Sequence, residues 1–374
     1  MHIPFCAQRC AYCNFILTTR ASEVDKSIFI NGLEKQLQYT LSRYGRQRFD
    51  TVYFGGGTPS ELTSPQIDDV FEILKRNDGC EISADSEMTV EMNPADVRAE
   101  SVDRWMFHGM NRVSLGAQSF NPDLLKKINR NHCPDDIFNS IKILRKAGIE
   151  NISLDLIIRL PGQTAEDVRN ACRISADLQV SQVVIYDLEV HERTVFGTLQ
   201  KQKKLILPDA DHHLEMYESA QKILSSEHGY DQYEILSFAK PGFQSKHNLK
   251  YWHNQEYLGL GPGAFSYLNQ TRYQYCSTVD RFLEKTQNND FSNDSEDVLS
   301  ESEIETETLL TGLRLKEGVQ KNRFIRIAKT LTYRVKPLIE RGFMRESDTR
   351  YFLTPEGVRV AEDVFMELSD IAVS

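Results

Sequence analysis

The stretch HIPFCAQRCAYC, residues 2–13, places three cysteines within eight residues, and the rest of the chain is interpreted from it. Cys6, Cys10 and Cys13 follow the spacing C-x3-C-x2-C after a short run that predicts a first strand. Three thiolates on one loop can hold three irons of a cubane [4Fe-4S] cluster, which leaves the fourth iron open to a small chelating ligand. A zinc site, which would need a fourth nearby ligand, and a chance grouping of buried thiols are the alternatives.

A glycine-rich turn is the second motif. The sequence GGGTPS, residues 55–60, directly follows a predicted strand at residues 51–54. Glycines let backbone N–H groups approach a ligand closely, and barrel sites lie at the carboxyl ends of strands. We therefore expect Gly56, Gly57 and Thr58 to contribute to a ligand site beside the cysteine loop.

The first 230 residues alternate short apolar or β-branched runs with charge-rich helical stretches, which is typical of βα units around a parallel sheet. Apolar residues three and four apart mark the helices. Six units are fewer than the eight of a full barrel of about 250 residues. We therefore expect an α/β fold with a partial (β/α)6 TIM-like barrel over residues 1–230. Besides the first strand, the predicted strands are 51–54, 87–91, 112–115, 153–158 and 183–188, and the predicted helices are 64–76, 135–147 and 165–178.

The remaining chain has a different pattern. Residues 231–285 read as an extension rich in Gly, Tyr and Phe, residues 286–302 as an acidic linker, and residues 303–374 as a C-terminal domain. Helices followed by a small hairpin indicate a small α/β domain of winged-helix type. The predicted helices there are 304–315, 322–329, 331–341 and one beginning at Pro355, and the hairpin pairs 343–345 with 351–354.

Charge and cysteine usage exclude several classes of protein. The net charge of −10 argues against a nucleic-acid binder, whose affinity depends on a basic surface. Eight acids and no Lys or Arg lie between residues 290 and 307, so much of the acidity is local. No apolar run approaches the length of a membrane-spanning helix, and seven cysteines without an export signal do not suggest a disulfide framework. We expect a cytoplasmic protein that does not span a membrane.

Together these motifs resemble the radical S-adenosylmethionine (SAM) superfamily. More narrowly, the order of five segments is similar to that of the HemN/HemW family, the oxygen-independent coproporphyrinogen III dehydrogenases and their relatives. The similarity runs from residue 2 to about residue 360. The five segments are HIPFC at 2–6, GGGTPS at 55–60, EMNP at 91–94, SLGAQSF at 114–120, and DL at 155–156 followed by LPGQT at 160–164.

The resemblance implies a radical SAM barrel, with a cluster on the three cysteines and SAM on the open iron. Carboxylates suit ribose hydroxyls because they accept two hydrogen bonds, and arginine suits a carboxylate because its donors form a fork. Gln118 and Arg130 could instead lie on the surface or cap helices, and Tyr12 could simply pack in the core. The matching family positions that would bind SAM are Tyr12, Gly56, Gly57, Thr58, Glu91, Gln118, Arg130 and Asp155.

Two features of the sequence distinguish between the subfamilies of the HemN/HemW family. The dehydrogenases carry a further cysteine two residues after the third cluster cysteine, whereas this chain has Phe15 there. The sequence HNLKYW, residues 247–252, matches the HNxxYW motif of HemW-type haem chaperones. The resemblance thus implies that His247, Tyr251 and Trp252 contact haem, since imidazole ligates iron and aromatic rings stack on a macrocycle. Packing of the domain junction by His247 and Trp252 is the alternative.

The expected function is therefore that of a HemW-like protein that binds a [4Fe-4S] cluster, SAM and haem and delivers haem to haem-requiring client proteins. Coproporphyrinogen III dehydrogenase, acting on a porphyrinogen, and a HemN-like radical SAM methyltransferase are the alternatives. Enzymatic turnover stays open, because the SAM-binding positions are retained. A homodimer is among the expectations for the oligomeric state. Arg159 departs from the family, since a small residue is usual at that position.

Overall fold

The computed structural model describes residues 1–373, and the chain divides into two compact units. The first unit comprises residues 1–230, 259–265 and 274–295. The second comprises residues 231–258, 266–273 and the chain from residue 296 onward.

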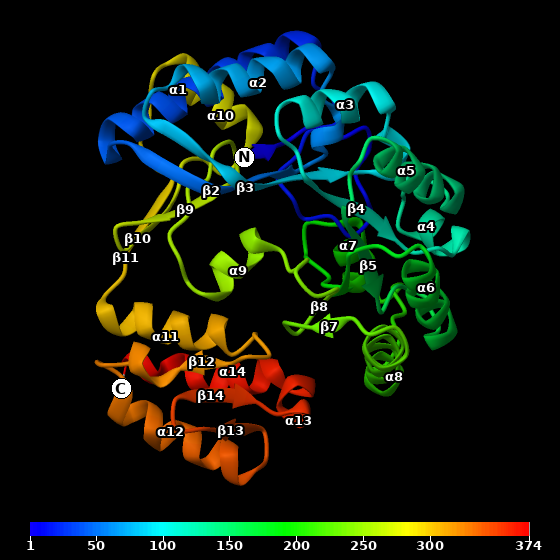
Figure 1. The fold of residues 1–374 in the computed structure, drawn as a ribbon, viewed down its shortest axis with the longest axis vertical. Helices are drawn as coiled ribbons and strands as arrows, with labels where there is room; N and C mark the ends of the chain where they lie inside the picture. The colour runs from blue at the N-terminus through cyan, green and yellow to red at the C-terminus, as the bar shows by residue number, and fades with distance from the viewer. Residues whose placement is uncertain (374) are drawn as a thin grey trace. The chain divides into compact units, whose positions relative to one another are not determined.

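The first unit is built on a parallel sheet whose strands follow one another in sequence order (Figure 1). All six expected strands are present. β2 and β3 are longer than predicted because they continue pairing toward their amino ends. This confirms the partial (β/α)6 barrel. The strands are β1 (His2–Ile3), β2 (Gln47–Gly56), β3 (Cys80–Met92), β4 (Arg112–Gln118), β5 (Asn151–Ile158) and β6 (Gln182–Asp187).

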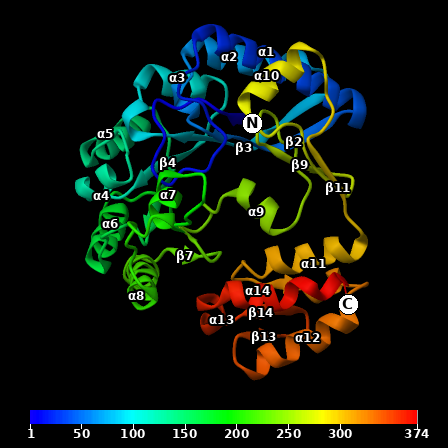
Figure 2. The same ribbon diagram turned by 180° about the vertical axis from the view of Figure 1, so that it is seen from behind.

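Helices cover the outer side of this sheet, as Figures 1 and 2 show from opposite directions. The amphipathic helices α2, α3, α5 and α6 bury apolar residues on one face, whereas α10 packs on α1 through Phe282 and Phe29. The prediction of α2 is correct at both ends, and those of α5 and α6 are correct to within one residue. The helices are α1 (Glu23–Tyr44), α2 (Ser64–Arg76), α3 (Ala99–Phe107), α4 (Pro122–Lys127), α5 (Pro134–Lys146), α6 (Ala165–Asp177), α7 (Val195–Lys201), α8 (Ala210–Gln221) and α10 (Val279–Gln287).

The second unit holds the C-terminal helices and the expected hairpin. Its apolar core is formed by α11, α12 and α14 together with the small sheet β12-β14-β13. Its strands are β7 (Asp231–Gln232), β8 (Ser237–Ala239), β9 (Phe265–Leu268), β10 (Thr271–Gln274), β11 (Ser295–Val298), β12 (Val319–Gln320), β13 (Met344–Glu346) and β14 (Arg350–Leu353). Its helices are α9 (Lys246–Trp252), α11 (Glu301–Gly312), α12 (Ala328–Glu340), α13 (Pro355–Arg359) and α14 (Ala361–Ser369).

The predicted helix at residues 322–329 is wrong. Only a short 3-10 turn at Lys321–Arg323 and the start of α12 are helical there. The Glu305 carboxylate accepts hydrogen bonds at 2.9 to 3.0 Å from the backbone N–H groups of Ile325, Arg326 and Ile327. These three donors, which precede α12, are therefore bonded to a side chain from α11 and not to carbonyls of a helix across the segment. The last predicted helix is also divided, at Val360, into α13 and α14.

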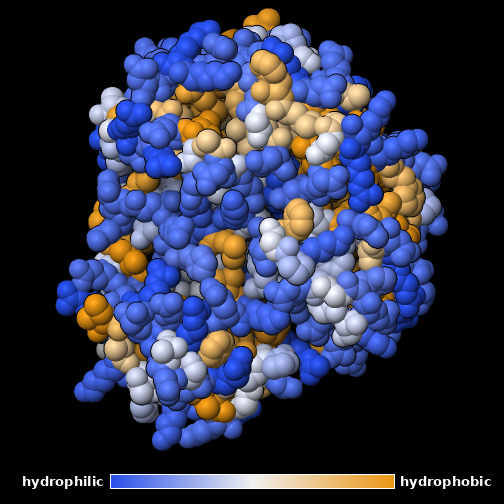
Figure 3. Space-filling model, viewed as in Figure 1, coloured by the Kyte–Doolittle hydropathy of each residue, from blue (hydrophilic) through white to orange (hydrophobic). Residues whose placement is uncertain are grey.

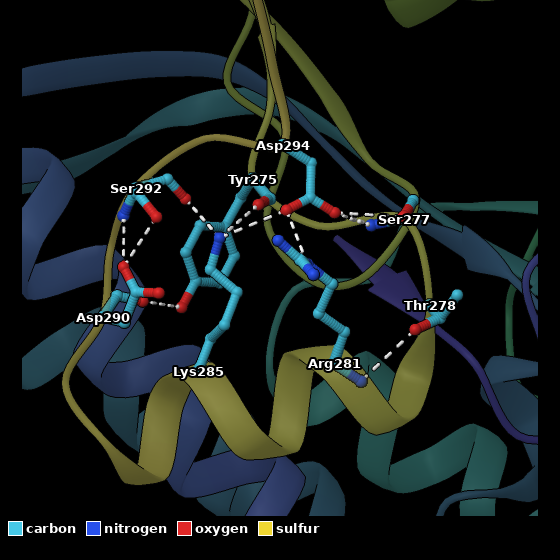
Figure 4. A network of polar contacts seen from close by, with 8 residues as sticks. All are labelled: Tyr275, Ser277, Thr278, Arg281, Lys285, Asp290, Ser292 and Asp294. Atoms are coloured by element: carbon cyan, nitrogen blue, oxygen red, sulfur yellow. Dashed lines mark hydrogen bonds and ion pairs between the residues drawn. The ribbon is translucent and has the colours of Figure 1, made fainter.

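The buried side chain of Lys285 forms hydrogen bonds with the acidic stretch after α10 (Figure 4). Lys285, which is 5% exposed, donates to the carbonyls of Tyr275 at 3.2 Å and Ser292 at 2.5 Å and to the Asp294 carboxylate at 3.3 Å. Asp294 also accepts from the Ser277 backbone and hydroxyl, both at 3.0 Å. This charge is compensated because every lysine donor meets an oxygen, so Asp294 has a structural role within the first unit.

The surface shown in Figure 3 is largely hydrophilic, with hydrophobic side chains in separate groups. Within residues 1–373, no helix combines the length and the apolar character needed to cross a bilayer.

Candidate functional site

The cysteine loop, residues 4–22, connects β1 to α1 and is folded by its own backbone hydrogen bonds. The Cys6 N–H donates to the Thr18 carbonyl at 3.1 Å, and the Cys13 N–H donates to the Cys10 carbonyl at 3.2 Å. The Ala11 N–H donates to the Ile128 carbonyl at 2.9 Å and anchors the loop after α4. All three cysteines are free thiols. In the described part of the chain, no three His, Cys, Asp or Glu side chains form a finished metal-ligand set, the three thiols included.

Polar groups from other strands meet the cysteine sulfurs. Cys6 Sγ lies 2.9 Å from the Thr58 hydroxyl, and Cys10 Sγ lies 3.5 Å from Arg130 Nη1. Burial is the main cause that raises the pKa of the Cys6 thiol to about 11; the hydrogen bond with Thr58 opposes this rise, and the Cys13 and Cys10 sulfurs contribute to it. The Arg130 charge opposes this by favouring the thiolate. Since iron binds thiolates, the loop must release protons when it takes up a metal.

The glycine turn lies against the cysteine loop. Gly57 N–H donates to the Ile3 carbonyl at 2.8 Å, so the end of β2 is fastened to β1. Gly56 has φ +111°, and a Cβ there would come within 2.6 Å of the His2 ring. The turn therefore requires glycine, and it brings Thr58 to Cys6 as the sequence suggested.

Two carboxylates come from other strands of the sheet. Glu91 lies near the carboxyl end of β3, and Asp155 lies within β5. Glu91 accepts from the Tyr53 hydroxyl at 2.7 Å and from the Gly56 N–H at 3.1 Å. Asp155 accepts from the Ser114 hydroxyl at 3.0 and 3.1 Å. Burial is the main cause that raises the pKa of both acids, to about 7 for Asp155, and their mutual repulsion adds to the shift of Asp155. Sequence reasoning missed Tyr53, although it lies only two residues before the glycine turn.

Arg130 and Gln118 complete the polar surroundings. Arg130 Nη2 donates to Asn93 Oδ1 at 2.8 Å and to the Gly116 carbonyl at 2.7 Å, so its guanidinium is fixed and neither caps a helix nor lies free on the surface. Gln118 has φ +62°, and its buried Oε1 has no hydrogen-bond partner among the described residues. Tyr12 packs beside an apolar cluster that contains Ala11 and Leu124.

These residues fit the cofactors that the sequence pattern implies. Three free thiols on one loop supply the donor set of a cluster with an open iron. An orphaned amide oxygen at Gln118 and two carboxylates on the same sheet supply acceptors for a polar ligand. A fixed arginine supplies a positive charge beside the thiols.

The HNxxYW segment forms the short helix α9 in the second unit. His247 Nε2 lies 3.0 Å from the Tyr251 hydroxyl, and the two rings meet edge to face at 5.2 Å. Tyr251 also meets Tyr257 at 4.8 Å. The Arg314 guanidinium lies 4.5 Å above the Trp252 ring, whose buried indole N–H has no acceptor within residues 1–373. His247 is thus within hydrogen-bond distance of Tyr251, and the Trp252 ring faces the Arg314 guanidinium.

In the absence of ligands, the Asp155→Asn variant is expected to have a larger free energy of unfolding than the wild-type protein. This difference is expected to grow as the pH rises. The folded-state pKa is about 7 against an ordinary 3.8. Between these values only the unfolded state loses the proton, so wild-type stability falls as pH rises to 7 and then levels off. The full difference is about 4 kcal/mol or less, since solvent reaches the half-buried group. Urea denaturation from pH 4 to pH 8 measures it, and a pH-independent difference would contradict the shift.

The fold and the cysteine loop define a radical SAM protein. The model of the Radical SAM superfamily matches residues 1–174, and the model of the HemN C-terminal domain matches residues 299–360. Membership of this superfamily implies a [4Fe-4S] cluster and SAM as cofactors. The structure is similar to that of coproporphyrinogen III oxidase (HemN) from Escherichia coli, with a TM-score of 0.86 over 98% of this chain and 88% of that chain at 19% identity. At that identity the likeness establishes the fold alone.

Sequence identity with named proteins identifies the family of this chain within the superfamily. The chain is 36% identical to heme chaperone HemW of Bacillus subtilis, over 98% of this chain and 97% of that protein. It is 36% identical to the Lactococcus lactis protein of the same name, over 97% and 95% of the two chains. It is 33% identical to HemW of Escherichia coli, over 71% and 68%. The chain belongs to the HemW family.

Proposed function

We propose that this protein is a haem chaperone: it binds a [4Fe-4S] cluster and SAM in the first unit and haem through α9, and it delivers haem to client proteins in the cytoplasm. The observation that carries the proposal is the identity with heme chaperones over nearly the whole chain. The absence of a cysteine at position 15 and the presence of the HNxxYW segment support the same function.

Within the first unit, Cys6, Cys10 and Cys13 would hold the cluster, and the cluster would supply an open iron and a reducing electron to SAM. Thr58 and Arg130 would surround the sulfurs with hydrogen-bond donors. The other residues with a proposed role in binding SAM are Tyr12, Gly56, Gly57, Glu91, Gln118 and Asp155.

The carboxylates and the glycine turn would orient this ligand. Glu91 and Asp155 would accept hydrogen bonds from ribose hydroxyls, which requires them to be ionised. Tyr53 holds Glu91 from the side, so one carboxylate oxygen is fixed before any ligand binds. Gln118 Oε1 would receive a donor from the ligand, which removes the cost of its buried and unsatisfied state.

In the second unit, His247 would ligate the haem iron through Nε2 after its hydrogen bond with Tyr251 opens. Tyr251 would then lie one helical turn away on the same face of α9 and contact the macrocycle. Trp252 would contribute its ring face on the side opposite Arg314.

The His247→Ala variant is expected to bind haem about tenfold more weakly and to shift the haem absorption maximum, because an axial nitrogen ligand is lost. Titration of the reconstituted protein with haem, followed by transfer to an apo haem protein, measures both steps. His228→Ala, an exposed histidine outside the segment, is the matched control. An unchanged spectrum in His247→Ala would refute the proposed ligand.

The same preparation separates chaperone from dehydrogenase. It is incubated anaerobically with SAM, a reductant and coproporphyrinogen III, and the products are analysed by mass spectrometry. The chaperone proposal predicts no decarboxylated porphyrinogen. Multiple turnovers to protoporphyrinogen IX would overturn it in favour of the biosynthetic enzyme.

A further inference from the structure

One face of the parallel sheet in the first unit carries polar side chains where a barrel interior is usually apolar. Alternate residues of a strand point to the same face, and the register sets Thr89 beside Arg112 and Glu91 beside Ser114. Ser114 in turn pairs with Ser153, and its hydroxyl reaches Asp155. Arg112 therefore lies on the face of the two proposed SAM-binding carboxylates, one inward position before Ser114.

Arg112 is a buried cation without a direct counterion. It is 2% exposed, its Nη2 donates to the Gln182 side chain at 2.7 Å, and its Nη1 reaches the Thr89 hydroxyl at 3.4 Å. Its Nε has no acceptor, and no carboxylate forms an ion pair with it, in the part of the chain that the structure describes. A buried charge of this kind opposes folding unless opposite charge lies near, and apolar residues of similar size often pack better. Structure alone therefore gives this position little reason to hold an arginine.

The opposite charge is supplied through space by the two acids. The positive charge of Arg112 lowers the pKa of both Glu91 and Asp155 and so opposes the effect of their burial. The other titratable groups facing these acids do not replace it. Burial raises the pKa of Tyr53, which is therefore neutral. Arg130, which is held by Cys10 and Asn93, also lowers the pKa of Asp155, and the Met1 amino group lowers that of Glu91, so Arg112 is the positive charge that lowers the pKa of both acids.

We propose that Arg112 is a positioning residue of this site: its buried positive charge compensates Glu91 and Asp155 and keeps both carboxylates ready to accept hydrogen bonds from the hydroxyls of SAM. This inference rests on the proposed function, since it takes the two acids as part of a SAM site. It assigns a supporting role to a side chain that is itself bonded to Gln182 and Thr89.

The test compares Arg112→Met, which removes the charge at similar length, with Arg112→Lys, which keeps it. SAM affinity of the reconstituted protein is measured by anaerobic calorimetry at pH values from about 6 to about 9. We expect Arg112→Met to bind about tenfold more weakly near neutral pH and to reach wild-type affinity only about one pH unit higher. Arg112→Lys should restore most of the affinity. Arg104→Met, which removes an arginine paired with Asp68 on α2, should match the wild type.

A loss of affinity in Arg112→Met that is equal at every pH would overturn the inference, because a structural defect does not follow the ionisation of the acids. Failure of Arg112→Lys to restore the affinity would overturn it as well. If the wild-type protein binds no SAM, the proposed function fails. The inference is then tested on the protein without cofactors, whose free energy of unfolding falls with rising pH until Asp155 is ionised in the folded state. In Arg112→Met this fall must continue to a higher pH than in the wild type. An unmoved end point would refute it.

Discussion

The Cys10→Ala variant is expected to hold no four-iron cluster after anaerobic reconstitution. Each cysteine of the loop supplies one of only three protein ligands, and two thiolates cannot retain a cubane with an already open iron. Cys10 is the position chosen, and its sulfur also lies 3.5 Å from Arg130 Nη1. Iron and sulfide content should fall from about four per chain to less than about one.

Cys80→Ala is the matched control for this experiment. Cys80 is also a half-buried free thiol, but it begins β3 and lies outside the cysteine loop. It should retain the full iron content and the broad absorption of the cluster. Four irons in Cys10→Ala would show that the loop is not the ligand set, and equal losses in both variants would indicate general misfolding.

Local chemistry explains why much of this site could be predicted from the sequence. The cysteine spacing and the glycine turn each lie within a few consecutive residues, so their chemistry is visible without knowledge of the fold. Glu91 could be placed because the carboxyl ends of parallel strands meet at one edge of a sheet, whereas Asp155 lies within β5 and not at its end. The family resemblance then selected these acids among many others.

Contacts between distant residues explain what could not be predicted. Tyr53 reads as an ordinary strand residue, and only the register of β2 with β3 brings its hydroxyl to Glu91. Arg112 likewise has no neighbour in sequence that marks it, since its partner Gln182 is 70 residues away. Glu305 looks like one more acid in an acidic stretch, yet its carboxylate accepts from the backbone N–H groups of three residues where a helix was expected.

The Gly57→Ala variant is expected to weaken both the fold and the hold on the cluster. A Cβ at this position would lie 2.7 Å from the Phe5 carbonyl oxygen and 2.9 Å from the Ile3 carbonyl oxygen. Both are backbone atoms, so the clash is not relieved by turning a side chain. Phe5 is 3% exposed and meets the Phe29 ring at 5.1 Å, so the core resists a shift of this strand. Overpacking of this kind costs about 1 to 3 kcal/mol.

The location of the clash determines which measurement is informative. Gly57 has no positive φ, so alanine can adopt its backbone conformation and the effect is one of space alone. Gly79→Ala is the control, since its added methyl would meet only the flexible Leu41 side chain at 3.3 Å. Because the strand that Gly57 would displace leads directly into Cys6, urea denaturation without iron and the rate of iron loss after reconstitution should change together. A destabilised Gly57→Ala protein that releases iron at the wild-type rate would show that the cluster loop is held independently of the glycine turn.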